Sequence, residues 1–141
     1  MQTPAELTRD FRHRGLKLTP QRQAIFAHLH RNDVHPTAQG VHSAVASTMP
    51  GISLRTVYQT LNDLVAMGEI HQVDLGGAAR FDPNTDDHHH LVCTGCGTVA
   101  DAAIDTAELV RRLDGFQASY TTVVVYGICR TCQGSPIALH R

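Results

Sequence analysis

Residues 53–81 read SLRTVYQTLNDLVAMGEIHQVDLGGAARF. The stretch opens with serine, a preferred helix N-cap residue, and apolar residues then recur at steps of three and four, as in a helix with one buried face. Gly68 supplies a common helix C-terminus. The strand-like segments 70–75 and 78–81 follow and flank a Gly-Gly pair, which signals a two-residue hairpin turn. The stretch therefore predicts a helix followed by a hairpin.

Three further helix starts precede this stretch. Residues 3–6 (TPAE) form a capping box with proline at the first helical position. Residues 19–20 repeat the threonine-proline start, and residues 35–37 (HPT) precede a third apolar-periodic segment. Short helices followed by a hairpin are the order of a winged helix-turn-helix, in which the last helix enters the major groove of DNA.

The helix within 53–68 is the candidate DNA-reading helix. With its apolar stripe turned inward, its outer and flanking residues carry side chains that can contact base edges or phosphates. Alone, this pattern fits an amphipathic helix with an ordinary solvated face equally well, and the hairpin after it favours DNA. The candidate reading residues are Arg55, Thr56, Tyr58, Gln59 and Asn62.

The overall composition is typical of a soluble globular chain, with 42% hydrophobic and 18% charged residues among 141. No apolar run approaches the ~20 residues that a membrane-spanning helix needs. The N-terminus lacks the basic and apolar regions of a signal peptide. We therefore expect a cytoplasmic protein of one domain, or two very small ones, with no membrane partner.

Charge divides unevenly along the chain. Residues 1–72 carry seven Lys/Arg against five Asp/Glu, and residues 73–141 carry five against eight, so balances of +2 and −3 give the net −1. The chain also holds ten histidines and four cysteines. A faintly basic half joined to an acidic half rich in Cys and His suggests two separate roles and points to metal binding.

The four cysteines form two C-x2-C pairs, Cys93 with Cys96 and Cys129 with Cys132. Two such pairs match the tetrahedral demand of a structural zinc ion. Gly97 offers the backbone freedom that the first turn needs. Disulfides are disfavoured without a secretory signal, and a redox C-x-x-C usually opens a helix and is not duplicated. The spacing therefore predicts a four-cysteine zinc site with a small domain folded between the pairs.

The second half predicts strands over 90–93 and 98–101, a helix starting at 105, and a long strand over 120–128 that is dense in Val and Thr. The apolar run 123–125 has two interpretations. It is either a surface covered by a second subunit or an ordinary buried core strand.

Three consecutive histidines precede the first cysteine pair. In an extended segment His88 and His90 point to one face and His89 to the other. With Asp82 and Asp101 nearby, the two imidazoles would make a mixed N/O site that suits iron, manganese or zinc rather than calcium. A solvated polar loop is the alternative interpretation.

Together, six stretches resemble the ferric uptake regulator (Fur) family of bacterial metal-dependent repressors over nearly the whole chain. The resemblance implies an α+β chain with a winged helix-turn-helix DNA-binding domain over 1–82, including wing and hinge. A small α/β dimerisation and metal-binding domain with the four-cysteine zinc would span 83–141. The six stretches are 18–22 (LTPQR), 35–38 (HPTA), 53–58 (SLRTVY), 80–82 (RFD), 88–93 (HHHLVC) and 126–129 (YGIC).

The resemblance also implies a regulatory Fe(2+) or Mn(2+) site. One ion that gathers all its ligands would fix the angle between the domains and, across a homodimer, the spacing of two reading helices on operator DNA. Metal binding would then select the DNA-competent arrangement. The implied ligands are His35, Asp82, His88, His90 and Asp101.

Two positions indicate the branch. Iron-sensing members more often have Glu where this chain has Asp101, and Arg where it has Gln59. The chain is therefore most similar to the peroxide-sensing (PerR) branch, in which ferrous iron reacts with peroxide and a coordinating histidine gains oxygen; His35 and His88 match those positions. An iron- or manganese-responsive uptake regulator without peroxide sensing is the alternative. Lys17 matches a position that reaches the minor groove.

The sequence gives weaker support for a further cation site and for other functional classes. Asp87, His89 and Glu108 could contribute to a further cation site, but Thr121 stands where members with that site often have His. A metal hydrolase or deaminase is not expected, because the chain has no H-E-x-x-H and no H-x-E with P-C-x-x-C. A zinc-held interaction module without DNA binding is the remaining class, and it would show no salt-dependent affinity for duplex DNA.

Overall fold

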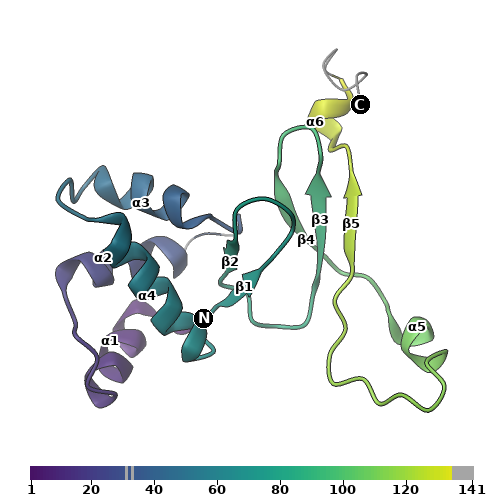
Figure 1. Ribbon diagram of the computed structural model, residues 1–141, viewed down its shortest axis with the longest axis horizontal. Helices are drawn as coiled ribbons and strands as arrows, with labels where there is room; N and C mark the ends of the chain where they lie inside the picture. The colour runs from purple at the N-terminus through teal and green to yellow at the C-terminus, as the bar shows by residue number, and fades with distance from the viewer. Residues whose placement is uncertain (31, 33, 135–141) are drawn as a thin grey trace. The chain divides into compact units, whose positions relative to one another are not determined.

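The computed structural model (Figure 1) describes residues 1–30, 32 and 34–134, and the chain divides into two compact units, Met1–Thr85 and Asp86–Arg141. The boundary predicted from the sequence, between 82 and 83, falls slightly earlier. No helix within the described residues is long and apolar enough to cross a membrane.

The first unit contains four helices, α1 (Pro4–His13), α2 (Pro20–His30), α3 (Ala38–Ala46) and α4 (Leu54–Ala66). Their starts confirm the predicted caps. The Thr3 hydroxyl accepts the Glu6 amide at 3.3 Å, and the Glu6 carboxylate accepts the Thr3 amide at 2.8 Å. These side chains replace the bonding partners that the first amides of an α-helix lack.

One apolar core joins the four helices to the hairpin that follows them. The Phe11 and Phe26 rings meet edge to face with centroids 4.8 Å apart, and the Arg22 guanidinium lies over Phe11. Arg22 also pairs with Asp63 at 2.8 Å and so ties α2 to α4. The fully buried apolar members of this core are Leu7, Phe11, Ile25, Phe26, Leu29, Val41, Val57, Leu61, Leu64 and Ile70.

The hairpin consists of β1 (His71–Val73) and β2 (Arg80–Asp82), paired antiparallel. The predicted two-residue turn is wrong, because the last pair of the ladder is Val73 with Arg80 and the loop spans 74–79. The Asp74 carboxylate accepts the Gly76 amide at 3.1 Å and Leu75 is buried, so a local side-chain turn ends the strand before the two glycines.

The second unit contains a three-stranded sheet in the order β4-β3-β5. Strand β3 (His89–Cys93) runs antiparallel to β4 (Val99–Ala102) and parallel to β5 (Val124–Gly127). Two short helices, α5 (Ala107–Arg111) and α6 (Arg130–Gln133), complete the described part of this unit.

The predicted long strand over 120–128 is wrong in extent. Only Val124–Gly127 joins the ladder, because β5 pairs with β3 alone and its pairs begin at His90 with Val124. The interpretation of 123–125 as a buried core strand is also wrong for the isolated chain. Val125 is 44% exposed, and Val123 and Val124 are only partly buried.

Candidate metal centres

The two cysteine pairs meet at one end of the second unit's sheet. Cys93 ends β3 and Cys96 lies in the turn to β4, while Cys129 caps α6 and Cys132 lies within it. The parallel pairing of β3 with β5 places Cys93 opposite Gly127 and so brings the second pair alongside the first. All four Sγ atoms lie within 4.8 Å of one another.

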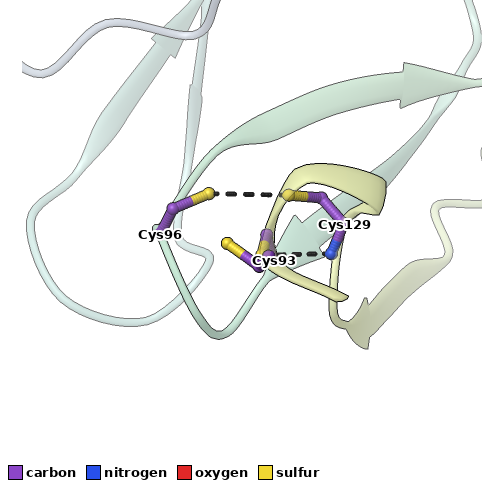
Figure 2. A group of neighbouring side chains, drawn as sticks. Cys93, Cys96 and Cys129 are labelled. Carbon is purple, nitrogen blue, oxygen red and sulfur yellow. Dashed lines mark hydrogen bonds between the residues drawn. The ribbon is translucent and has the colours of Figure 1, made fainter. Parts of the chain in front are cut away.

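Figure 2 shows how the main chain supports these sulfurs. The Cys129 amide donates to Cys93 Sγ at 3.2 Å, and the sulfurs of Cys96 and Cys129 are 3.8 Å apart. Gly97 has a φ of +75°, a left-handed conformation that glycine adopts without strain. At Gly95 an added Cβ would lie 3.2 Å from Cys132 Sγ, so the turn passes close against the cluster.

The pKa values of these thiols diverge. Main-chain amides of Cys129 and then Cys96 lower the pKa of Cys93 to about 6, and the Thr98 hydroxyl lowers the pKa of Cys96. Cys132 instead faces other sulfurs, first Cys129, and its pKa is raised to about 12. Thiolates this close repel one another, and a divalent cation offsets that repulsion. The donor set therefore fits a structural zinc.

The first unit contributes a buried histidine-carboxylate pair. His35 precedes α3 and Asp82 ends β2, and each is 2% exposed. His35 Nε2 and Asp82 Oδ2 are 3.2 Å apart. The other oxygen of Asp82 accepts the amide of Asn84 at 2.9 Å, which orients the carboxylate.

Three further predicted ligands converge within the second unit. His90 on β3 lies opposite Asp101 on β4 in the antiparallel register. His88 Nε2 is 3.1 Å from His90 Nε2 and 3.5 Å from Asp101 Oδ1. Because His88 Nδ1 donates to the Asp86 carbonyl at 2.6 Å, its Nε2 is the nitrogen with a lone pair to offer. Two imidazole nitrogens and a carboxylate oxygen at such distances fit a divalent transition-metal ion.

His89 points away from this group, as the alternation predicted. Its Nε2 donates to the Ile104 carbonyl at 3.0 Å, and its Nδ1 accepts the Val123 amide at 3.2 Å. Glu108 accepts bonds from Arg111 and Arg112. Two groups of His, Cys, Asp and Glu lie close enough to share an ion within residues 1–30, 32 and 34–134. Neither group includes Asp87, His89 or Glu108.

The candidate DNA-contacting residues lie at the surface of the first unit. On α4 the apolar stripe is buried as predicted, leaving Arg55, Tyr58, Gln59 and Asn62 exposed. Thr56 is half-buried, and its hydroxyl lies 2.9 Å from that of Ser53. Lys17 is exposed between α1 and α2. Their contact with DNA stays a prediction.

Two residues that support these centres were not identified from the sequence. Thr98 bonds Cys96 at 3.1 Å, and Arg80 donates to the carbonyl of His35 at 3.1 Å. Arg80 was signalled only as part of the stretch 80–82 that carries the family resemblance, without a role of its own, whereas nothing in the spacing indicated Thr98.

Comparison with known proteins places these features in one family. The profile of the ferric uptake regulator family matches residues 13–124. The peroxide-responsive repressor PerR of Staphylococcus aureus (strain Mu50) is 32% identical over 127 residues, 86% of each chain. The solved Helicobacter pylori ferric uptake regulator Fur has a TM-score of 0.79 at 22% identity, covering 94% of this chain and 92% of that one.

A zinc-bound manganese uptake regulator has a TM-score of 0.73 at 26% identity, covering 91% of this chain and 99% of that chain. The solved structures named for ferric and manganese uptake regulators therefore share this architecture of helices followed by small sheets. The match over residues 13–124 and the 32% identity to PerR show that the chain belongs to the ferric uptake regulator family of transcriptional regulators.

Proposed function

We propose that this chain is a homodimeric, metal-dependent repressor that binds operator DNA and senses hydrogen peroxide. Family membership supports metal-responsive regulation, and the 32% identity to PerR supports the peroxide response. The observation that carries the proposal is that each unit holds part of a nitrogen and oxygen donor set: His35 with Asp82 in the first, and His88, His90 with Asp101 in the second.

In this proposal one Fe(2+) or Mn(2+) takes ligands from both units, while the four cysteines hold a structural Zn(2+). The regulatory ligands are the residues already described in the two units. Because the first unit carries the candidate DNA-reading helix, an ion bound to both sets would restrict where that helix lies. The cysteine site would stabilise the second unit whatever the state of the regulatory ion.

Ferrous iron, when bound, would activate peroxide beside its ligands, so that one peroxide oxygen becomes bonded to an imidazole carbon and the other leaves as water. His35 and His88 are the imidazoles proposed to gain oxygen there. An oxidised imidazole is a poorer nitrogen donor, so the ligand set would weaken and the first unit would lose its DNA-competent position. His35 is 2% exposed. The oxidant should therefore reach its ring from the bound ion and not from the solvent.

Operator binding is proposed to use α4 and Lys17. Arg55 and Gln59 offer the donors that read guanine and adenine, and Tyr58 offers a hydroxyl and an aromatic face. Lys17 and Arg55 are cations at the surface, so the affinity for duplex DNA should fall steeply as salt rises and phosphate contacts release counterions. An interaction module without DNA binding would show no such slope.

An iron- or manganese-responsive uptake regulator is the second candidate. The fold likeness to a manganese uptake regulator favours it, since nitrogen and oxygen donors suit either ion. The two functions differ only in whether peroxide alters the ligands.

Mass spectrometry of peptides after anaerobic Fe(2+) loading and dilute peroxide separates the candidates. Added oxygen on the peptides containing His35 or His88, absent from a Mn(2+)-loaded control, is the expected result. Intact histidines in both samples would replace the peroxide sensor with the uptake regulator.

A further inference from the structure

Strand β2 has main-chain partners on both of its edges. One edge pairs with β1 through Gln72 opposite Phe81. On the other edge Thr37 forms an antiparallel bridge with Arg80, and the Phe81 amide donates to the Pro36 carbonyl at 2.9 Å. The segment that carries His35 is therefore joined to the strand that carries Asp82.

The side chain of Arg80 adds a second kind of bond to the same junction. Its Nη1 donates to the carbonyl oxygen of His35 at 3.1 Å, and Arg80 is only half-exposed. A charged donor makes a stronger hydrogen bond than a neutral one, and a partly buried bond is less weakened by water. We refer to this bond, together with the Phe81–Pro36 bond, as the His35 tether.

The tether bears directly on the histidine-carboxylate pair of the first unit. His35 belongs to no helix or strand, so the regular hydrogen bonds of a helix or a sheet do not hold its main chain in place. Asp82, by contrast, is held in the ladder opposite His71. The 3.2 Å separation of His35 Nε2 and Asp82 Oδ2 therefore depends on bonds that join residues 35–36 to residues 80–81.

We propose that Arg80 is a positioning residue for the regulatory cation, holding the main chain of His35 so that the His35–Asp82 pair is formed before the ion binds. The inference rests on the proposed function, because it takes the pair to be part of the regulatory site. Pre-formed ligands bind a metal more tightly than ligands that must first be ordered.

The same tether connects the pair to α3 and to the hairpin. Thr37, next to the tether, caps α3 by accepting the Gly40 amide at 3.0 Å. Arg80 opens β2 at the end of the loop 74–79. A change in the position of His35 would therefore alter the position of the first turn of α3 and of the hairpin directly, and not by way of α4.

The test compares the full-length, zinc-containing wild type with Arg80→Ala, Arg80→Lys and the control Arg14→Ala. Arg14 is an exposed arginine at the C-cap of α1, in the same unit. Mn(2+) affinity is measured by competition with a chelator. We expect R80A to bind Mn(2+) about 10-fold or more weakly, R80K to recover part of the loss, and R14A to match the wild type.

Amide hydrogen exchange in the protein without regulatory metal provides the second readout. In R80A the Phe81 amide should exchange at least about 10-fold faster, while the core amide of Ile25 keeps its protection. Faster exchange at both amides would mean that Arg80 merely stabilises the fold, and would overturn the inference.

A His35→Ala variant separates this inference from the proposed function. Weak Mn(2+) binding in H35A with wild-type binding in R80A would overturn the role of Arg80 alone. Wild-type binding in H35A would overturn the proposed regulatory site, and the role of Arg80 with it.

Discussion

The sulfur atoms of the four-cysteine cluster have unequal surroundings. The pKa of Cys93 is lowered to about 6 by main-chain amides, whereas the pKa of Cys132 is raised to about 12 by the sulfurs around it. Zinc binding must therefore displace a proton from Cys132 at neutral pH, while Cys93 is already largely a thiolate. In the zinc-free protein Cys93 should gain a proton as the pH falls through about 6, so the zinc affinity measured by competition with a chelator should fall below that pH.

Replacing Cys96 by serine should release the zinc and leave the second unit unfolded or the protein monomeric. The hydroxyl is a poor ligand, and three sulfurs remain within a few ångströms of one another. Zinc content by elemental analysis and mass by sedimentation would measure this. His88→Ala is the control, since it should keep both zinc and dimer. A stable, active C96S dimer would contradict the structural-zinc assignment.

A side chain at Gly95 would crowd the cysteine cluster. An added Cβ would lie 3.2 Å from Cys132 Sγ and 3.3 Å from its Cβ, so Gly95→Ala should push the second cysteine pair away and weaken zinc binding. Gly127→Ala, where an added Cβ meets nothing within 4 Å, is the matched control. Zinc release to a chelator should be faster than in the wild type in G95A only. Equal release rates in G95A and the wild type would show that the turn can move to accommodate the added methyl group.

Among the elements, α1 depends on its capping box. Thr3→Ala removes the acceptor for the Glu6 amide and should lower the free energy of unfolding by ~1 kcal/mol. The bonds from Thr3 also lower the pKa of Glu6 below 4.5. Because the folded pKa is the lower one, this contribution is present above about pH 4.5 and is lost as pH falls through the folded value.

Thermal unfolding of wild type and Glu6→Gln from pH 3 to 7 checks the sign. The two melting temperatures should differ at neutral pH and approach each other in acid. A difference that persisted or grew at pH 3 would exclude the ionised carboxylate as the cap.

Gln59 on α4 should determine which base the protein prefers at one position of its operator. An amide suits adenine and a guanidinium suits guanine, so Gln59→Arg should shift the preferred base at one position by ~1–3 kcal/mol. Selection from randomised duplexes with Mn(2+)-loaded protein measures this preference. Gln23→Arg, at an exposed glutamine on α2 outside the candidate reading residues, is the control for the added charge. An unchanged preference in Q59R would remove Gln59 from the reading residues.

For the whole molecule, the sheet of the second unit exposes apolar surface. Leu91 and Val125 are register partners on adjacent strands and are 43% and 44% exposed. A second copy of the chain would bury this surface. Val125→Asp should therefore dissociate the proposed homodimer in sedimentation equilibrium, with zinc retained. Ser43→Asp, at an exposed position on α3, is the control for the added charge. If V125D remained dimeric, the subunit contact would lie elsewhere.

Much of the architecture could be read from local signals. The caps at Thr3, Thr37 and Ser53 predicted three helix starts, because a cap bonds amides only three residues away. The two C-x2-C pairs predicted the sulfur cluster from chemistry alone. The alternation of the histidines correctly separated His89 from its neighbours, because strand geometry imposes a period of two.

The amino-acid sequence by itself determined the helices of the first unit, the cysteine pairs and the facing of the histidines, since each depends on residues close together in the chain. Only the tertiary structure decided where the hairpin turns, how short β5 is and which side chain holds His35. Those features depend on bonds between distant segments, such as β3 with β5 and Arg80 with His35. Propensity within one segment carries no information about the partner that completes it.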